Sequence, residues 1–184
     1  SDYGSKNFKR STLRKLLDYF SWFYSDKIIS NNNIGVKYLL SLLFIDKKKI
    51  AVINNGISIP DKLESKSSSK IVIGCMGNLH KYKNQMVLVE AYYRIYPKAD
   101  LLIAGEGAEE RSIINNLKGL NIDYKKVLLG KVTDITTFYN SINIFVHPSL
   151  REGSPNALLE AMAHEKLCIV SDIKENREAL GESP

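Results

Sequence analysis

The sequence contains few of the residues that build disulfide frameworks and metal centres. Its 184 residues include only two cysteines and three histidines. Cys75 and Cys168 both fall in apolar runs that are typical of buried strands, so we expect two core thiols in a reducing compartment and no structural disulfide. The sequence has no Asp-x-Asp motif and no cluster of histidines and cysteines. It therefore predicts no bound metal and no cofactor.

Long apolar runs are also missing. The longest one, residues 38–45, contains Ser41 and is far shorter than the roughly 20 residues that a membrane-spanning helix requires. No stretch has the pattern of a signal peptide. These absences predict a cytoplasmic protein.

The composition is that of an ordinary soluble globular protein, with 44% hydrophobic and 25% charged residues. The formal net charge of +6 favours an anionic partner, which could be nucleic acid, anionic lipid or a phosphorylated small molecule. Charge alone does not choose between these three. Abundant lysine, asparagine and isoleucine are compatible with an AT-rich bacterial source.

From residue 71 onward, short apolar runs alternate with amphipathic stretches. The apolar runs predict strands at 71–76, 101–104, 127–129, 144–146 and 167–170. The amphipathic stretches predict helices at 84–96, 108–117, 134–141, 155–164 and 174–180. Continuously apolar strands suit a sheet that is buried on both faces, and repeated strand–helix units predict parallel strands with right-handed crossovers. We therefore expect an α/β fold, a Rossmann-like parallel sheet with helices on both faces.

The pattern ahead of this repeat is different. It predicts helices at 9–24 and 34–44, strands at 26–30 and 49–53, and a polar linker at 59–70. Two strands and two helices are too few for a closed α/β domain, and no strand follows the last predicted helix. We therefore expect a chain truncated at both ends, in which residues 1–58 end one domain and residues 71–184 form a second domain without its last elements.

Residues 149–163 combine two carboxylates with a predicted helix start. Glu152 and Glu160 are eight positions apart, and Ser154 and Pro155 between them suit the N-cap and the first position of a helix. The free N–H groups and the positive dipole end of that helix favour a phosphate group. The segment follows a predicted buried strand, so it should lie at the carboxyl edge of the sheet, where α/β folds bind ligands. A phosphate site beside two carboxylates suits a nucleotide diphosphate sugar.

Six short motifs follow one another along the chain. They are Asn55-Gly56, Gly77-Asn78-Leu79 with Lys83, Ala104-Gly105-Glu106-Gly107, Leu129-Gly130-Lys131-Val132, Pro148-Ser149, and Glu152 with Glu160 ahead of Ala161-Met162-Ala163. In these motifs the chain resembles the carboxyl-terminal half of a family 4 retaining glycosyltransferase, a nucleotide-sugar enzyme with the GT-B fold. The resemblance implies that residues 1–58 are the tail of the amino-terminal acceptor domain and that residues 71–184 bind the nucleotide-sugar donor.

The resemblance also implies roles for individual residues. Glu160 would accept hydrogen bonds from the ribose hydroxyls, and Glu152 would contact the donor sugar and stabilise the transition state. Lys83 would neutralise the leaving diphosphate, backbone N–H groups at 156–157 would bind the distal phosphate, and the main chain of Val132 would bind the base. The implied donor-binding set is Gly77, Asn78, Lys83, Val132, Ser149, Glu152, Gly153, Ser154, Asn156, Ala157 and Glu160, of which Glu152 and Lys83 are also catalytic.

The chain departs from the family pattern at Asn78. The family usually has an arginine there, so one phosphate-neutralising cation is absent from its expected place. His80, Lys81 or Arg151 could replace it, and the sequence does not choose between them. We expect His147, at the end of a predicted strand, to be structural, and the other two histidines to lie on the surface.

These observations lead to one main functional hypothesis. The chain would be the donor-binding part of a hexosyl- or N-acetylhexosaminyltransferase of cell-surface polysaccharide biosynthesis. Its donor would be a UDP- or GDP-linked sugar. The acceptor, a saccharide or lipid-linked saccharide, would bind to the missing domain, so this chain alone would not transfer sugar efficiently. The alternatives are a nucleotide-sugar epimerase of the same fold, against which the two spaced glutamates argue, and a basic nucleic-acid-binding module, which is disfavoured because the lysines are scattered.

The amino-terminal predicted helix combines basic and aromatic residues. Its basic part contains Lys6, Lys9, Arg10, Arg14 and Lys15, and its aromatic part contains Tyr19, Phe20, Trp22, Phe23 and Tyr24. Such a composition is typical of a helix on a membrane surface, which would place the protein at the inner face of the membrane. The helical spacing of its apolar residues slightly favours a face that packs against the missing half instead. Both interpretations stay open at this point.

Overall fold

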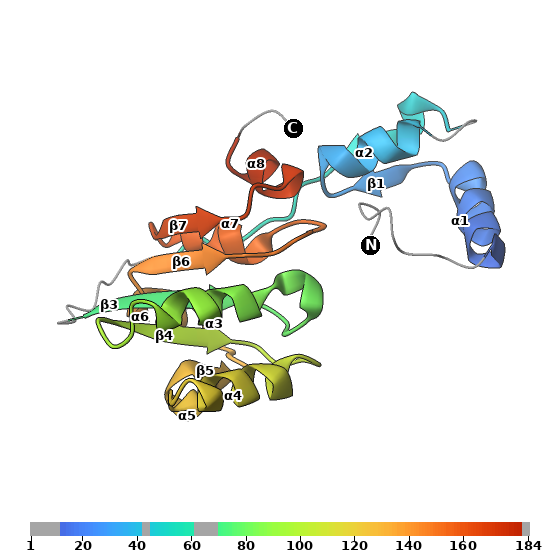
Figure 1. Cartoon of the computed structure of the whole chain (residues 1–184). Helices are drawn as coiled ribbons and strands as arrows, with labels where there is room; N and C mark the ends of the chain where they lie inside the picture. The colour runs from blue at the N-terminus through green and yellow to red at the C-terminus, as the bar shows by residue number, and fades with distance from the viewer. Residues whose placement is uncertain (1–11, 42–44, 61–69, 182–184) are drawn as a thin grey trace.

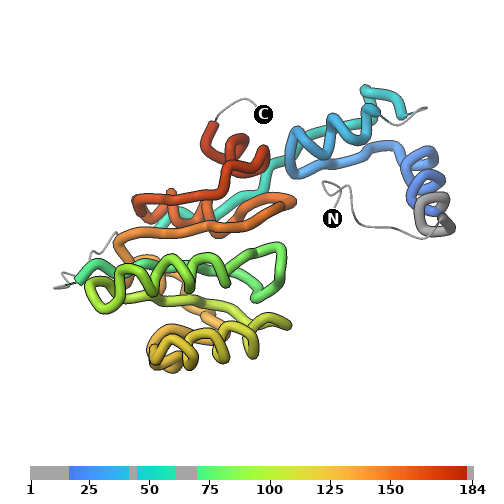
Figure 2. Tube along the Cα trace, viewed as in Figure 1, coloured from blue at the N-terminus to red at the C-terminus, as the bar shows by residue number. Residues whose placement is uncertain are grey.

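The computed structural model of the chain describes residues 12–41, 45–60 and 70–181, with side chains from residue 17 onward. It contains a larger α/β unit and a smaller unit built from the residues before position 60 (Figure 1; Figure 2). The start of the helix predicted at 9–24, the end of the one predicted at 34–44 and most of the predicted linker lie outside the described residues.

Five parallel strands form the sheet of the larger unit. In chain order they are β3 (Ile71–Met76), β4 (Ala99–Ala104), β5 (Leu128–Gly130), β6 (Ile144–His147) and β7 (Leu167–Val170). Their order across the sheet is β5-β4-β3-β6-β7, with every neighbouring pair parallel. The chain therefore winds outward in both directions from the central β3. This is the expected Rossmann-like arrangement, because continuously apolar strands can be covered on both faces.

Helices cover both faces of the sheet (Figure 1). One face carries α3 (Gln85–Tyr93), α4 (Glu110–Gly119) and the short α5 (Tyr124–Val127). The opposite face carries α6 (Ile135–Ser141), α7 (Asn156–Ala163) and α8 (Lys174–Ala179).

Each face of the sheet has its own apolar core. On the first face Leu117 of α4 packs with Ile103 of β4. On the second face Phe138 and Leu158 pack with Phe145 of β6. All five side chains are at most 3% exposed, and burying one such side chain contributes about 1.5–3 kcal/mol. The two cores therefore hold the helices and, through them, the strand ends from which the loops emerge.

Local sequence signals misplaced several element ends. The helix predicted at 84–96 ends at Tyr93, because the chain turns ahead of Pro97. The helix predicted at 108–117 runs from Glu110 through Gly119, and the left-handed residue that follows it is Asn121, with φ 56°. The four-residue helix α5 was not predicted, since a segment of one turn carries no readable periodicity.

The smaller unit is a two-stranded parallel sheet with helices. It consists of α1 (Thr12–Tyr24), β1 (Ile28–Ser30), α2 (Asn33–Leu40), the 3-10 turn η1 (Lys47–Lys49) and β2 (Ile50–Val52). Asn32 caps α2 by accepting a hydrogen bond from the Gly35 N–H. The apolar residues Leu17, Phe20 and Phe23 of α1 are 61%, 54% and 52% exposed. This helix therefore presents an open apolar face.

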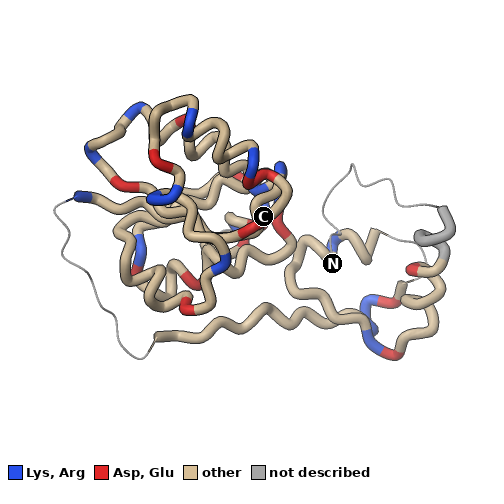
Figure 3. The backbone as a smooth tube through the Cα atoms, turned by 90° about the horizontal axis from the view of Figure 1, so that it is seen from below, with Lys and Arg blue, Asp and Glu red and all other residues tan. Residues whose placement is uncertain are grey.

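Charged residues of both signs are interspersed along the described chain (Figure 3). None of the helices within the described ranges combines the length and the hydropathy needed to cross a membrane.

Candidate active site

The sheet changes its winding direction between β3 and β6. These strands are neighbours in the sheet, although β4 and β5 separate them in the sequence. Loops that leave two such strands diverge, and the crevice between them is the usual ligand site of an α/β fold. The loop after β3 carries Gly77 and the 3-10 turn η2 (Lys81–Lys83), and the loop after β6 carries Ser149 and Glu152. The fold thus brings together predicted site residues that are 69 positions apart.

Glu152 is the centre of a buried ionic cluster. Its Oε1 lies 2.6 Å from Nζ of Lys83 and 2.9 Å from Nε2 of His147. The side chains of Glu152, Lys83 and His147 are 6%, 17% and 2% exposed. A carboxylate this deeply buried requires such partners. The structure thus places the predicted catalytic pair in direct contact and adds His147 to it.

The surroundings of Glu152 keep its carboxylate ionised. Burial raises the pKa of Glu152, but the polar groups of His147, Lys83 and Ser149 beside its carboxylate together outweigh burial and lower the pKa from 4.5 to about 2. A carboxylate with such a pKa cannot donate a proton at neutral pH. It can accept hydrogen bonds from hydroxyl groups and stabilise a nearby positive charge.

The loop after β3 lies closely against the loop after β4. The Leu79 N–H donates a hydrogen bond to the Glu106 carbonyl (2.9 Å). Gly105 and Gly107 have φ of 136° and 157°, and a Cβ on Gly105 would overlap the carbonyl group of Gly77. Only glycine combines this backbone conformation with this close approach. The glycine motif after β4 therefore shapes the loop that carries the predicted donor-binding residues.

Two cationic side chains and a histidine ring gather on the ring of Tyr82. The Arg151 guanidinium carbon lies 4.9 Å, and the Lys83 Nζ 5.9 Å, from the ring centroid. The His80 ring stacks on Tyr82 with the centroids 5.5 Å apart. Cation–π contacts of this kind hold basic groups in place without neutralising them. The sequence analysis named three residues that could replace the family arginine at position 78. Two of them, His80 and Arg151, therefore lie on the same ring as Lys83.

Glu160, in α7, is held by Tyr139 of α6. The Tyr139 hydroxyl lies 3.0 Å from Glu160 Oε2 and 2.9 Å from the Ala157 carbonyl. Burial, together with the charge of Glu160, raises the pKa of Tyr139, so its hydroxyl stays neutral. His164 stacks on the Tyr139 ring at 4.8 Å and is 3% exposed. The expectation of a surface position for His164 is wrong, because its ring closes the core at the end of α7.

Helix α7 begins one residue later than expected. Pro155 is the N-cap and Asn156 the first helical residue, and no side chain caps the helix. The predicted cap at Ser154 is therefore wrong, because Pro155 has ψ 68° and does not enter the helix. The Asn156 N–H donates to the Ser154 carbonyl (2.9 Å), so it would have to change partner to bind a phosphate. Glu160 lies just over one turn into the helix.

Asparagines of the smaller unit contact the loop between β6 and α7. The Asn32 Nδ2 donates a hydrogen bond to the Gly153 carbonyl (2.5 Å). The Asn55 Nδ2, from the Asn55-Gly56 motif, donates to Asn156 Oδ1 (2.8 Å). A third asparagine, at the start of α2, donates to a carboxylate of α8. The smaller unit is thus hydrogen-bonded to the loop that holds Glu152.

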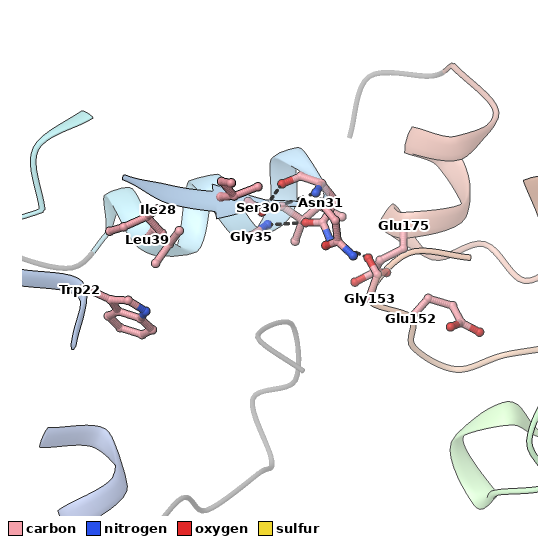
Figure 4. A pocket seen from close by; sticks show the side chains of 12 residues that line it. Trp22, Ile28, Ser30, Asn31, Gly35, Leu39, Glu152, Gly153 and Glu175 are labelled. Carbon is pink, nitrogen blue, oxygen red and sulfur yellow. Dashed lines mark hydrogen bonds between the residues drawn. The ribbon is translucent and has the colours of Figure 1, made fainter. Parts of the chain in front are cut away.

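A cavity of about 80 Å³ lies between the two units and is lined in part by Glu152. Trp22 and Asn31 line it from the smaller unit, and Glu175 lines it from the larger one (Figure 4). Aromatic, amide and carboxylate side chains together are suited to a sugar, which has apolar faces and many hydroxyl groups. The sequence did not bring these three residues together in one site, because their proximity depends on how the two units meet.

Val132 is the predicted contact of the base. It follows β5 and packs against the core that contains Tyr139. Among the described residues, no three histidine, cysteine, aspartate or glutamate side chains are grouped so that they could hold a metal ion.

Comparison with known proteins identifies the larger unit. The family model described as Glycosyl transferases group 1 matches residues 70–183. The chain is 29% identical, over 184 residues, to the Escherichia coli UDP-Gal:alpha-D-GlcNAc-diphosphoundecaprenol alpha-1,3-galactosyltransferase, a match that covers 88% of this chain and 46% of that protein. It is 28% identical, over 182 residues, to the Campylobacter jejuni N-acetylgalactosamine-N,N'-diacetylbacillosaminyl-diphospho-undecaprenol 4-alpha-N-acetylgalactosaminyltransferase, covering 96% of this chain and 50% of that protein. The chain thus spans about half the length of the curated relatives it matches.

A solved structure shows the same fold. Anabaena HepE, in complex with UDP and glucose, superposes with a TM-score of 0.80 at 19% identity, over 96% of this chain and 53% of that one. The expected α/β fold of the GT-B type is therefore confirmed. Because the family model covers more than half of its residues, the chain belongs to the group 1 glycosyltransferases.

Proposed function

We propose that this chain is the donor-binding part of a retaining glycosyltransferase of cell-surface polysaccharide biosynthesis. The observation that carries the proposal is the contact between Lys83 and Glu152 at the switch point of the sheet. It puts a cation and a stable anion where a nucleotide sugar would bind. In this proposal residues 1–58 end the acceptor domain, residues 59–70 are a linker and residues 71–184 form the donor domain.

The proposed reaction separates charge between a sugar ring and a diphosphate. Negative charge grows on the leaving phosphate while the ring gains oxocarbenium character. Lys83 and the N-terminal end of α7 would stabilise the phosphate, with Arg151 as a second cation. Glu152, which stays ionised, would accept hydrogen bonds from the sugar hydroxyls and stabilise the positive ring. Lys83 would have to move from Glu152 to the phosphate when the donor binds.

The nucleoside would bind beside α7. Glu160 would accept hydrogen bonds from the ribose hydroxyls, held in position by Tyr139, and the main chain of Val132 would bind the base. The Escherichia coli relative is named for UDP-Gal and HepE was solved with UDP. A UDP-linked hexose or N-acetylhexosamine is therefore our first candidate for the donor, and a GDP-linked sugar is the second.

The proposed acceptor is a lipid-linked saccharide. The two relatives are named for acceptors on diphosphoundecaprenol, which supports an enzyme at the cytoplasmic face of the membrane. The open apolar face of α1, with Leu17, Phe20 and Phe23, suits packing against the rest of an acceptor domain and also suits membrane contact. Flotation of the chain with anionic vesicles distinguishes these two uses of α1.

Ligand-observed NMR with UDP, GDP and ADP tests the donor-binding proposal on this chain. We expect one nucleotide to bind and its affinity to fall in Glu160→Gln, with no change in Glu90→Gln, which alters an exposed carboxylate of α3. We also predict that EDTA leaves this binding unchanged, because Lys83 and α7 supply the positive charge. Binding of oligonucleotides in place of nucleotides would contradict the proposal and support the nucleic-acid alternative. Interconversion of sugar isomers by the full-length enzyme would support the epimerase alternative.

A further inference from the structure

His147 is the most deeply buried member of the Glu152 cluster. It is the last residue of β6 and is 2% exposed. Its backbone is fixed by β7, since it pairs with Val170 and its carbonyl accepts a hydrogen bond from the Ser171 N–H (3.0 Å). Its ring stacks on Phe145 with the centroids 6.0 Å apart. This packing of strand and ring holds the imidazole beside Glu152.

Lys83 and His147 approach the same oxygen of Glu152, but the Lys83 side chain is freer to move. Lys83 reaches Oε1 with a long side chain from the loop after β3, is 17% exposed, and also lies over the Tyr82 ring. His147 reaches Oε1 from a strand and is 2% exposed. An ammonium group that is to bind a diphosphate must leave the carboxylate. A buried carboxylate that loses its only partner is strongly destabilised.

We propose that His147 is a positioning residue that holds Glu152 in place while Lys83 transfers to the diphosphate of the donor. This proposal rests on the proposed donor-binding function. Without His147, Glu152 Oε1 keeps the Lys83 ammonium as its partner, and the carboxylate competes with the diphosphate for it. The presence of His147 thus makes Lys83 available to the donor, although His147 itself touches neither the nucleotide nor the sugar.

A double-mutant cycle on the binding of UDP to this chain tests the proposal, with GDP or ADP used if it is the nucleotide that binds. His147→Phe keeps a ring against Phe145 and removes the donor, and it should weaken nucleotide binding at least about tenfold. His147→Gln restores an N–H donor and should recover most of the affinity. In a Glu152→Gln background Lys83 is already free, so His147→Phe should change the affinity by less than about twofold. An equal loss in both backgrounds would mean a merely structural role and would overturn the proposal.

A second measurement does not require nucleotide. The carboxyl carbon of Glu152, followed by NMR as the pH is lowered, should titrate about one unit or more higher in His147→Phe than in the wild-type chain. In His147→Gln it should titrate close to the wild-type value. An unchanged midpoint in His147→Phe would show that Lys83 alone holds Glu152, and the proposal would be wrong. If the wild-type chain binds no nucleotide, the proposed donor-binding function fails while this titration still decides the role of His147.

Discussion

Replacing Glu152 by glutamine should change how the stability of the fold depends on pH. Burial raises the pKa of Glu152, but the His147 ring and the Lys83 ammonium beside its carboxylate lower it from 4.5 to about 2 in the folded chain. Because the folded-state pKa lies below the unfolded-state pKa, ionised Glu152 stabilises the fold fully above about pH 4.5, and this contribution is lost as the pH falls through about 2. The difference of about 2.5 pH units corresponds to roughly 3 kcal/mol at neutral pH. The Glu152 side chain is 6% exposed, so solvent screens little of this contribution.

Urea unfolding at a series of pH values measures the effect. Urea slopes of about 1–3 kcal/mol/M are usual for small proteins. The difference in urea midpoint between the wild-type chain and Glu152→Gln should therefore shrink by about 1 to 3 M between neutral pH and about pH 2. Glu90→Gln, on the exposed side of α3, should follow the wild-type profile at every pH. A midpoint difference for Glu152→Gln that is the same at all pH values would refute the reasoning, because the cluster would then not hold the carboxylate ionised.

Three further substitutions test the packing around the site. Gly105→Ala should destabilise the fold by more than about 1 kcal/mol, since its Cβ would overlap the neighbouring loop at a positive φ. Gly119→Ala, with open space around its Cβ, should be neutral or stabilising by up to about 1 kcal/mol; thermal melting compares the two. Tyr139→Phe should lower the free energy of unfolding in urea by about 1 kcal/mol and weaken nucleotide binding, because Glu160 loses its hydroxyl partner. An unchanged affinity would show that Tyr139 does not support nucleotide binding. Asn32→Ala should lower the stability of the fold by about 0.5–2 kcal/mol through loss of the α2 cap. Amide hydrogen exchange in α2 should become faster, and unchanged exchange would contradict this prediction.

Most of the sheet could be predicted from the sequence. Its strands are short apolar runs separated by amphipathic helices, and this alternation has few solutions besides a doubly wound parallel sheet. The strands at 71–76 and 167–170 agree with β3 and β7 residue for residue. The helix ends were less accurate, because they depend on single turns whose conformation is decided by what packs against them.

The loop before α7 shows how tertiary contacts override a local rule. Ser154 and Pro155 have the residue types of a cap and a first helical position, yet the helix begins at Asn156. Asn32 donates a hydrogen bond to the Gly153 carbonyl of this loop, and Asn55 donates one to the side chain of Asn156. These contacts come from residues of the smaller unit that are 121 and 101 positions away in the sequence. Capping preferences of about 1 kcal/mol are too small to prevail over several such contacts.

The sequence pointed to Glu152 and Glu160 as site candidates but not to two of the side chains that contact them. Glu152 and Glu160 could be proposed from the sequence because two carboxylates on either side of a helix start are suited to a phosphorylated sugar. The side chains that hold them, His147 and Tyr139, read as ordinary core residues, since each lies in an apolar segment and is almost fully buried. Their function depends on one polar atom at the edge of the core, which hydrophobic periodicity does not reveal. A buried polar side chain at the carboxyl end of a strand therefore indicates a ligand site by itself. Burial is unfavourable unless the polar atom has a partner. At this edge of the sheet the partner is a carboxylate of the candidate site.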